Sequence, residues 1–419
     1  MEQRSPDISP PASPPGRPPL PTGNRLFWFS IGLSLLVGMT INLLPVTFKV
    51  FEKLFQAGYE MQGRAEALFF LGALAGNILA GQVTHSRGPS VSVKRGLAVG
   101  ALGFLLLGGA QNWLMAQAGA VLMGAGQVWL TVVYATITAH QFQESRQRVF
   151  AALALTMAIG GTLAPLGLGA YVDHAWLERG WPWWIPYAGL MCFYLLTRLT
   201  VPSIPEWTPS AASEGDPSAG RRLVLSPSLW LIGLAFTLHG IGQMGAVVWL
   251  GRLFAKRLLL SETQVGSMIA VNITGFIAGR VIWTWLGGRI PERILLGCSA
   301  GVGATFYVLT ILSGSYELAL AMTFVAGMGM SGDAIALQSF TALRFRRQAA
   351  RAFGITQALG HLGAAMGPYY IGFVGDHSGT LEQGIWVIPI TIGTLSLLGF
   401  LWHLLDRPAR QREFGQDQA

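Results

Sequence analysis

The chain has 419 residues, of which 52% are hydrophobic and only 11% are charged. Roughly a quarter of the residues of a soluble domain are charged. The few charged residues of this chain cannot cover a water-exposed surface, so lipid must be its main solvent. The formal net charge of +8 is therefore interpreted as a signal of membrane orientation, and not as evidence for nucleic-acid binding.

The chain begins with a proline-rich stretch, residues 1–24, which cannot form an apolar helix. We expect a disordered, polyproline-like tail on the cytoplasmic side. Its PxxP spacings leave two interpretations open, a solvated tail or a docking element. The sequence does not identify a partner for it.

Twelve apolar stretches follow, each long enough or nearly so to cross the ~30 Å hydrocarbon core of a bilayer. They are predicted near 26–48, 65–84, 94–112, 114–138, 149–172, 182–200, 228–254, 263–286, 293–312, 316–342, 352–375 and 384–404. The polar stretch 201–227 is the predicted linker between a first half (25–200) and a second half (228–404), and 405–419 is a predicted cytoplasmic tail. The expected fold class is an all-α membrane protein with two six-helix bundles.

The second half repeats the first at a fixed offset of 203 residues. When residues 124–174 are placed on 327–377 without gaps, twelve positions are identical. They are Gly124/Gly327, Gly126/Gly329, Thr138/Thr341, Ala139/Ala342, Phe142/Phe345, Arg148/Arg351, Phe150/Phe353, Gly160/Gly363, Pro165/Pro368, Gly169/Gly372, Asp173/Asp376 and His174/His377. An even number of crossings separates the copies, so they run in the same direction. Many transporters are built in this way, with the substrate site between the halves.

Basic residues are distributed unequally between the two sides of the predicted bundle. Of the Lys and Arg residues, 20 lie on the side of the termini, seven lie on the opposite side and Arg280 falls within a helix. By the positive-inside rule both termini are expected in the cytoplasm, and the chain is expected to be a multi-pass protein of the plasma or inner membrane. The aromatic cluster at 181–187 suits the outer headgroup region.

These features resemble the major facilitator superfamily over essentially residues 26–404. The loop signature of that family, G-x-x-x-D-R-x-G-R-R, has a degraded counterpart in Gly81-Gln-Val-Thr-His85-Ser-Arg87-Gly88 and a second in Trp285-Leu-Gly-Gly288-Arg289. His85 and Gly288 replace the acidic residue, which in the family helps to latch the cytoplasmic side. The resemblance implies a gating role for His85, Arg87 and Arg289. It implies the same for Pro165 and Pro368, which lie in partial copies of an antiporter motif.

Two segments resemble the monocarboxylate and oxalate/formate porter branch of this superfamily. They are Gly279-Arg280-Val-Ile-Trp-Thr-Trp-Leu-Gly-Gly-Arg289-Ile, and the stretch from Arg351-Ala-Phe-Gly-Ile to Gly375-Asp376-His377-Ser-Gly. Porters of that branch have an arginine in the eighth helix that is associated with anion binding. The resemblance therefore implies an anion-binding role for Arg280.

Arg280 is also prominent by its position alone. It lies ~10 Å from the cytoplasmic end of its helix, by the rise of 1.5 Å per residue. An unpaired Arg at the bilayer centre costs about 2.5–3.5 kcal/mol or more, so this side chain should face protein or water. Its planar guanidinium suits a carboxylate ligand. The alternative is an internal ion pair or bonds to backbone carbonyls.

Asp333 is interpreted as the only acidic residue well inside an apolar stretch, and the repeat places Leu130 at the matching position. One interpretation is a proton carrier whose protonation changes with desolvation and with the proximity of Arg280. The other is a static partner of Arg280. Both interpretations stay open.

Further polar residues are candidates for the lining of a substrate cavity. His239 with Gln243, and Gln357 with His361, are four residues apart and share a helix face, where they could bind substrate, relay protons or simply bond neighbouring helices. The other candidates are Asn42, Gln127, Tyr134 and Asn272. Asp173-His174 and Asp376-His377, at matching helix ends, are expected to form caps or hydrogen bonds near the outer surface.

No catalytic residues, metal site, cofactor or ATP-binding domain are expected, because no nucleophile–base pair, metal-ligand spacing or phosphate loop is present. Gradients or exchange must then supply the energy. The prediction is a secondary active transporter for a small organic anion, a monocarboxylate, working by alternating access with protons as a coupling ion. An exporter of drug-like or amphipathic compounds, and a non-transporting sensor or scaffold, are the alternatives.

Overall fold

The computed structural model describes residues 20–205, 222–287, 289–345 and 349–416. Most of the predicted proline-rich tail and of the linker lie outside these residues, as does Gly288 of the second loop signature. The described segments consist of helices joined by short turns.

The described residues of the first half form eight helical elements, and those of the second half form seven. In the first half they are α1 (Arg25–Ile41), α2 (Leu44–Phe55), α3 (Tyr59–Arg87), α4 (Pro89–Gly108), α5 (Trp113–Gln141), α6 (Arg146–Ala170) with the π-helix η1 (Tyr171–Leu177), and α7 (Ile185–Leu199). In the second half they are α9 (Pro227–Leu258), α10 (Glu262–Gly287), α11 (Glu292–Leu312), α12 (Tyr316–Arg344), α13 (Ala349–Ser378), α14 (Leu381–Gly384) and α15 (Val387–Gln416).

The predicted membrane-crossing segments are present as helices. By length and composition, nine helical spans of the described residues are able to cross a bilayer, and α1 with α2 forms a tenth that is bent by 42°. The short helix α7 (15 residues) and the long helix α13 (30 residues) complete twelve crossing segments. The all-helical fold of two six-helix halves is confirmed.

The spans differ from the sequence prediction in three places. The first span is broken at Asn42–Leu43, where Pro45 in the first turn of α2 has no N–H to continue the helix. The fifth span continues beyond residue 172 as the π-helix η1. Residues 405–416 of the predicted tail continue the last span, because α15 extends to Gln416.

The duplication extends to helix caps and to helix contacts. The side chains of Asn112 and Ser315, 203 residues apart, accept hydrogen bonds from the third residue of α5 and α12 respectively. A Cβ on Gly124 would lie 1.9 Å from the Phe69 carbonyl oxygen, and one on Gly327 would lie 2.3 Å from that of Asn272. Glycine is therefore required for α5 to approach α3 and for α12 to approach α10 so closely.

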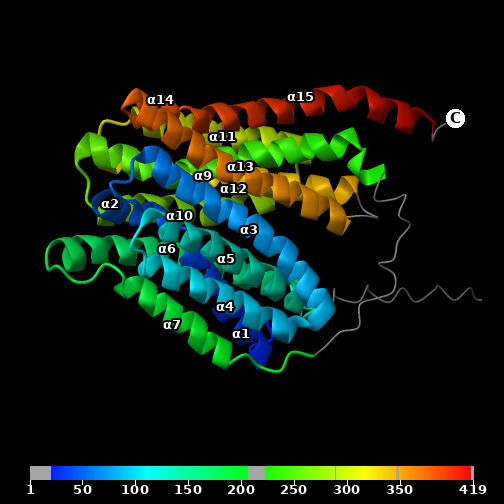
Figure 1. Cartoon of the computed structure of the whole chain (residues 1–419). Coiled ribbons are helices and arrows are strands. Elements are labelled where there is room, and N and C mark those ends of the chain that lie inside the picture. The colour runs from blue at the N-terminus through cyan, green and yellow to red at the C-terminus, as the bar shows by residue number, and fades with distance from the viewer. Residues whose placement is uncertain (1–19, 206–221, 288, 346–348, 417–419) are drawn as a thin grey trace, which may run out of the picture.

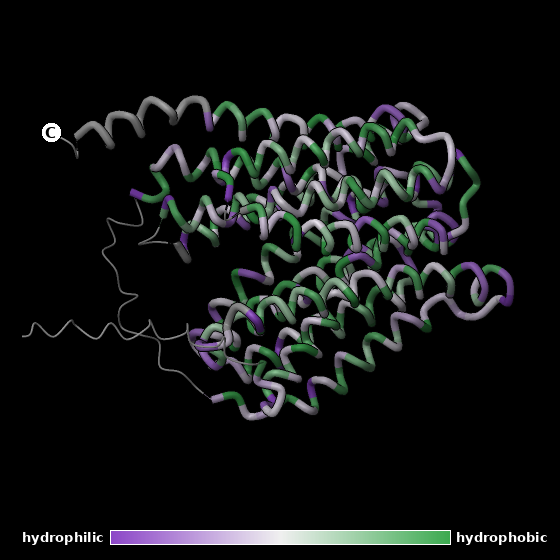
Figure 2. The backbone as a smooth tube through the Cα atoms, turned by 180° about the vertical axis from the view of Figure 1, so that it is seen from behind, coloured by the Kyte–Doolittle hydropathy of each residue, from purple (hydrophilic) through white to green (hydrophobic). Residues whose placement is uncertain are grey.

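The two halves lie side by side, with both described ends of the chain at one end of the molecule (Figure 1). We call this end the termini face, and the opposite end, where α2, η1 and α14 lie, the far face. The helices of the two halves are close together at the far face and diverge toward the termini face. Hydrophilic residues gather mostly at the two ends of the helices, and apolar residues line their length (Figure 2).

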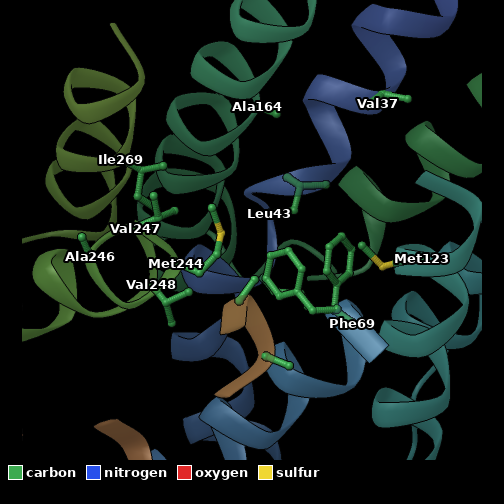
Figure 3. Packing of buried hydrophobic residues seen from close by; sticks show 14 of the residues in the cluster. Val37, Leu43, Phe69, Met123, Ala164, Met244, Ala246, Val247, Val248 and Ile269 are labelled. Atoms are coloured by element: carbon green, nitrogen blue, oxygen red, sulfur yellow. The ribbon is translucent and has the colours of Figure 1, made fainter. Parts of the chain in front are cut away.

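A buried hydrophobic cluster crosses the boundary between the halves. Leu43 and Phe69 from the first half lie in the same cluster as Met244 and Val247 from the second (Figure 3). Met244 and Val247 follow His239 along α9, on its far-face side. The middle of the molecule is thus bounded by apolar packing toward the far face.

Candidate functional site

A buried acid–base pair lies halfway along two neighbouring helices of the second half. His239 Nδ1 of α9 is 2.9 Å from Asp333 Oδ1 of α12, and the two residues are 8% and 0% exposed. The separation is that of an ion pair, but its geometry is not that of a directed hydrogen bond, and both Asp333 oxygens lack a hydrogen-bond donor among the described residues. One acidic and one basic side chain therefore lie side by side in the interior of the second half.

The first half has no such pair at the corresponding positions. Gly38 of α1 lies against the Met157 carbonyl, and Gly240 of α9 lies against the Gly360 carbonyl in the same way. Helices α1 and α9 therefore correspond at an offset of 202 residues, one residue shorter than the offset of 203 in the rest of the repeat. His239 then corresponds to Val37, and Asp333 to Leu130. Both are fully buried. Because apolar side chains suffice for this packing in the first half, the polar pair is not required by the fold.

Arg280 of α10 has no counter-ion within 4 Å among the described residues. Its Nε is buried without a hydrogen-bond partner, and its guanidinium carbon lies 5.1 Å from the centre of the Phe276 ring. Tyr134 of the first half and His239 are its ionisable neighbours. The predicted alternative in which Asp333 is a static partner of Arg280 is wrong, because the ion-pair partner of Asp333 is His239.

Two more predicted residues belong to this central group. Tyr134 is buried on α5, with its hydroxyl 3.9 Å from the Met157 sulfur, and brings a polar group of the first half toward Arg280. Gln243 lies one turn from His239 on α9 and shares its face. With Arg280, His239 and Asp333 they bring one cation, one carboxylate and several neutral polar groups together.

Two of the remaining polar candidates, Asn42 and Asn272, bond neighbouring helices. Asn42 donates to the Gly161 carbonyl oxygen at 3.4 Å, beside the break in the first span. Asn272 donates to the Tyr307 hydroxyl at 3.1 Å, within the second half. His361 Nδ1 lies 2.9 Å from the backbone oxygen of Gln357, not from its side chain. Gln127 is buried on α5.

The predicted gating residues fall into two groups. His85 and Arg87 are exposed at the end of α3, and exposed Arg289 stacks 3.8 Å over the Trp285 ring, all at the termini face. Pro165 and Pro368 lie where the halves touch. A Cβ on Gly266 would be 2.5 Å from the Pro165 carbonyl oxygen, and one on Gly63 would be 2.5 Å from that of Pro368.

The far face is closed by two matching helix caps that join the halves. Asp173 of η1 accepts hydrogen bonds from the backbone N–H groups of Glu262 (3.0 Å) and Thr263 (2.7 Å), at the start of α10. Asp376 of α13 accepts from those of Tyr59 (2.8 Å) and Glu60 (2.9 Å), at the start of α3. Each carboxylate compensates the positive end of a helix in the opposite half. The predicted caps are confirmed, but their reach across the halves was not predicted.

A buried arginine adds a third connection at the far face. Arg252 of α9 donates to the carbonyl oxygens of Pro45 (2.8 Å) and Val46 (3.2 Å) in α2, and pairs with Glu262 at 2.7 Å. The same Glu262 begins α10, whose N–H groups Asp173 caps. One polar network therefore joins α2, α9, α10 and η1 across the boundary of the halves.

The sequence analysis missed a second buried acid. Glu66 on α3 is 1% exposed, and its Oε2 has no hydrogen-bond partner in the described part of the chain. The statement that Asp333 is the only acidic residue well inside an apolar stretch is therefore wrong. The second span was predicted to begin at residue 65, which placed Glu66 at its edge, whereas α3 begins at Tyr59.

Comparisons with known proteins agree with this architecture. A family model described as "Major Facilitator Superfamily" matches residues 30–259 and 232–419. The chain is 27% identical over 293 residues to a 2-nitroimidazole transporter of Escherichia coli (strain K12), covering 67% of this chain and 69% of the relative. It is 24% identical over 313 residues to the cyanate transport protein CynX of the same organism, covering 73% and 77%.

Solved structures share the fold at low sequence identity. The nucleoside transporter NupG superimposes with a TM-score of 0.74 at 14% identity, covering 91% of this chain and 99% of that one. Together with the family match along nearly the whole chain, the duplicated six-helix halves identify the class of protein. The chain belongs to the major facilitator superfamily and is a secondary transporter, not an enzyme.

Proposed function

We propose that this transporter moves a small organic anion, a monocarboxylate, together with a proton, and that it works by alternating access. The observation that carries the proposal is the guanidinium of Arg280, which is partly buried, with its Nε buried and unpaired and with no carboxylate of the described residues within 4 Å. A cation at this depth is costly without a partner, so an anionic substrate supplies the missing charge. The flat fork of nitrogen donors suits both oxygens of a carboxylate.

The His239–Asp333 pair supports the coupling to protons. With one proton shared, the pair is neutral overall and the central group has the single positive charge of Arg280. Without that proton the pair is negative, and the group is neutral overall. Binding of a monoanion is then favoured by the protonated pair and weakened when the proton leaves, which couples the two ligands thermodynamically.

The far-face contacts support the alternating-access part of the proposal. The Asp173 and Asp376 caps and the Arg252 network hold the halves together at the far face. The substrate would enter this state from the termini face, between the diverging helices. Opening the far face requires these contacts to break while residues 25–200 and 228–404 rock about the central group. The unequal distribution of Lys and Arg supports a cytoplasmic location for the termini face.

The relatives support two substrate classes. Cyanate, named for one relative, is a small monovalent anion and agrees with an arginine anchor. The other relative is named for 2-nitroimidazole, which favours a second candidate, the transport of small uncharged aromatic compounds. For such a compound the positive charge of Arg280 would be dispensable.

Transport by purified protein in liposomes tests the proposal. Labelled small carboxylates and cyanate are offered with and without an inward proton gradient, to the wild type, Arg280→Gln and the matched control Arg179→Gln, whose side chain is exposed at the far face. We expect gradient-driven uptake of one anion that Arg280→Gln loses and Arg179→Gln retains. Normal transport by Arg280→Gln contradicts the anchoring role, and uptake of 2-nitroimidazole alone favours the second candidate.

A further inference from the structure

We propose that Glu66 is a second proton-binding group and that closure of the far face requires its protonation. Glu66 lies outside the central site, because its helix α3 contributes no residue to that group. The inference rests on the proposed alternating access, since it describes what one of the two conformations demands of this carboxyl.

Glu66 is enclosed by the closed far face. It is the eighth residue of α3, so it lies ~10 Å from the start of that helix by the rise per residue. The residue is 1% exposed and its Oε2 has no donor. A carboxylate buried without a cation or donors costs several kcal/mol, whereas the neutral acid is tolerated far better, so this site favours the acid with its proton.

The basic residues around the far face do not compensate Glu66. Lys49 pairs with Glu52, Arg64 with Glu60, Arg252 with Glu262 and Arg257 with Glu382. Among the described residues, no ion pair within 4 Å joins Glu66 to a basic side chain. The ionisable residues of the helices packed against α3 are Lys49, Glu52 and Lys53 (α2), Lys94 and Arg95 (α4), Tyr134 and His140 (α5), and Arg351, His361, Tyr369, Tyr370, Asp376 and His377 (α13).

The packing of the helix does not explain an acid at this position. The residue 203 positions later, Ile269 on α10, is 2% exposed and belongs to the hydrophobic cluster that also contains Met244 and Val247 (Figure 3). An aliphatic side chain therefore fills the corresponding space in the second half. Glu66 thus places a titratable carboxyl group where Ile269 contributes only apolar packing.

Glu66 lies one turn beyond the contacts that must break when the far face opens. Asp376 of α13 caps Tyr59 and Glu60 at the start of α3, and Gly63 lies against the Pro368 carbonyl. When α3 and α13 part at these residues, water reaches the next turn of α3 and stabilises the charged carboxylate. The open state thus releases a proton, and the closed state takes one up.

Linkage gives the sign and the limit of the effect. Because the closed far face binds one proton more at Glu66, the ratio of open to closed molecules rises with pH, by at most about tenfold per pH unit for a single proton. Acid on this side therefore favours closure. With glutamine at this position the closed state needs no proton, and this contribution to the pH dependence disappears.

Distances between spin labels at the far face test the inference without any knowledge of the substrate. Labels at Leu54 of the first half and Leu259 of the second, both exposed, report opening as a longer separation, in protein whose Cys192 and Cys298 are replaced by Ser. The wild type, Glu66→Gln, Asp333→Asn and the exposed-acid control Glu317→Gln are compared in liposomes from acid to alkaline pH. Glu66→Ile, which copies Ile269, serves if the glutamine variant does not fold.

We expect the ratio of open to closed molecules to rise with pH in the wild type and in Glu317→Gln. Asp333→Asn should show the same rise, because it retains Glu66. In Glu66→Gln, the logarithm of this ratio should change with pH at most half as steeply as in the wild type. An equal slope in Glu66→Gln and the wild type overturns the inference and leaves alternating access intact. A slope that only Asp333→Asn removes overturns it as well. Absence of the open state in every variant at every pH contradicts both this inference and the proposed function.

Discussion

Asp173 and Asp376 occupy matching positions in the two halves, and each carboxylate accepts hydrogen bonds from two backbone N–H groups of the opposite half. The two contacts are therefore related by the internal duplication, although each joins different helices. They lie at the same end of the molecule, so they act together on one conformational step. Five predictions concern these residues, their surroundings and the central group.

We expect Asp173→Asn and Asp376→Asn each to increase the far-face-open fraction. Loss of the charge weakens a cap worth about 1 kcal/mol or more, and 1.4 kcal/mol is tenfold in an equilibrium. Label distances across the far face measure the change, with exposed His174→Ala as the control. The two effects should be similar in size, and an effect of one variant alone would contradict the paired role.

The buried Arg252–Glu262 pair should show strong coupling in stability. Replacing Arg252 by Met or Glu262 by Leu leaves the other charge buried without its partner, which typically costs 3–5 kcal/mol, whereas replacing both costs far less. Thermal unfolding of the single variants and of the double variant in detergent gives the coupling free energy. If the losses of stability of the two single variants add up to that of the double variant, Arg252 and Glu262 do not stabilise each other as an ion pair.

Asp333→Asn should separate anion exchange from proton-driven accumulation. The neutral amide removes the titratable pair but leaves the positive charge of Arg280, so exchange of labelled for unlabelled substrate should persist. Uptake driven by a proton gradient should be lost. The two assays on one preparation of liposomes measure this, and retention of gradient-driven uptake would exclude Asp333 as the coupling group.

Arg280→Lys should transport less well than the wild type but better than Arg280→Gln. Lysine retains the charge and loses the planar fork, so the substrate keeps a point-charge partner without a bidentate one. The concentration dependence of uptake measures this, and we expect the main change in the apparent substrate affinity. Equal behaviour of the Lys and Gln variants would show that the fork, and not the charge, is required.

Gly169→Ala should weaken the closed far face, while Gly167→Ala on the same helix should not. A Cβ at Gly169 would lie 2.5 Å from the Glu262 carbonyl oxygen, a backbone atom that cannot move aside, whereas Gly167 has open space around it. Label distances at the far face again give the open fraction. Equal changes of the open fraction in the two variants would indicate that any replacement of glycine in this helix has this effect, and would contradict a specific role of the close contact at Gly169.

The sequence predicted the features that follow from the succession of residues along the chain. Helical spans follow from the length of apolar runs, and the offset of 203 residues located the second half and both aspartates. Contacts between helices were not accessible in the same way. His239 was paired with Gln243 because they share a helix face, but the partner of His239 lies on α12, and the direction of that contact depends on how the two helices pack.

Two local errors had signals in the sequence. Pro45 lies inside the first apolar run, and a proline in a helix removes a hydrogen bond and favours the break that the structure has between α1 and α2. Glu66 was assigned to the edge of a span because the preceding residues are polar, although the helix begins seven residues earlier. The lack of a counter-ion at Arg280 within the described segments could not be deduced, because it depends on which base pairs with Asp333.

Most of the hydrogen bonds that close the far face have a specific side chain on one side of the boundary and backbone on the other. Asp173 and Asp376 bind N–H groups, and Arg252 binds the carbonyls of Pro45 and Val46. A substitution at Tyr59 or Val46 leaves the bonded backbone atoms in place, so these hydrogen bonds demand no compensating change in the other half. Correlated substitution among related sequences would therefore not reveal these particular contacts.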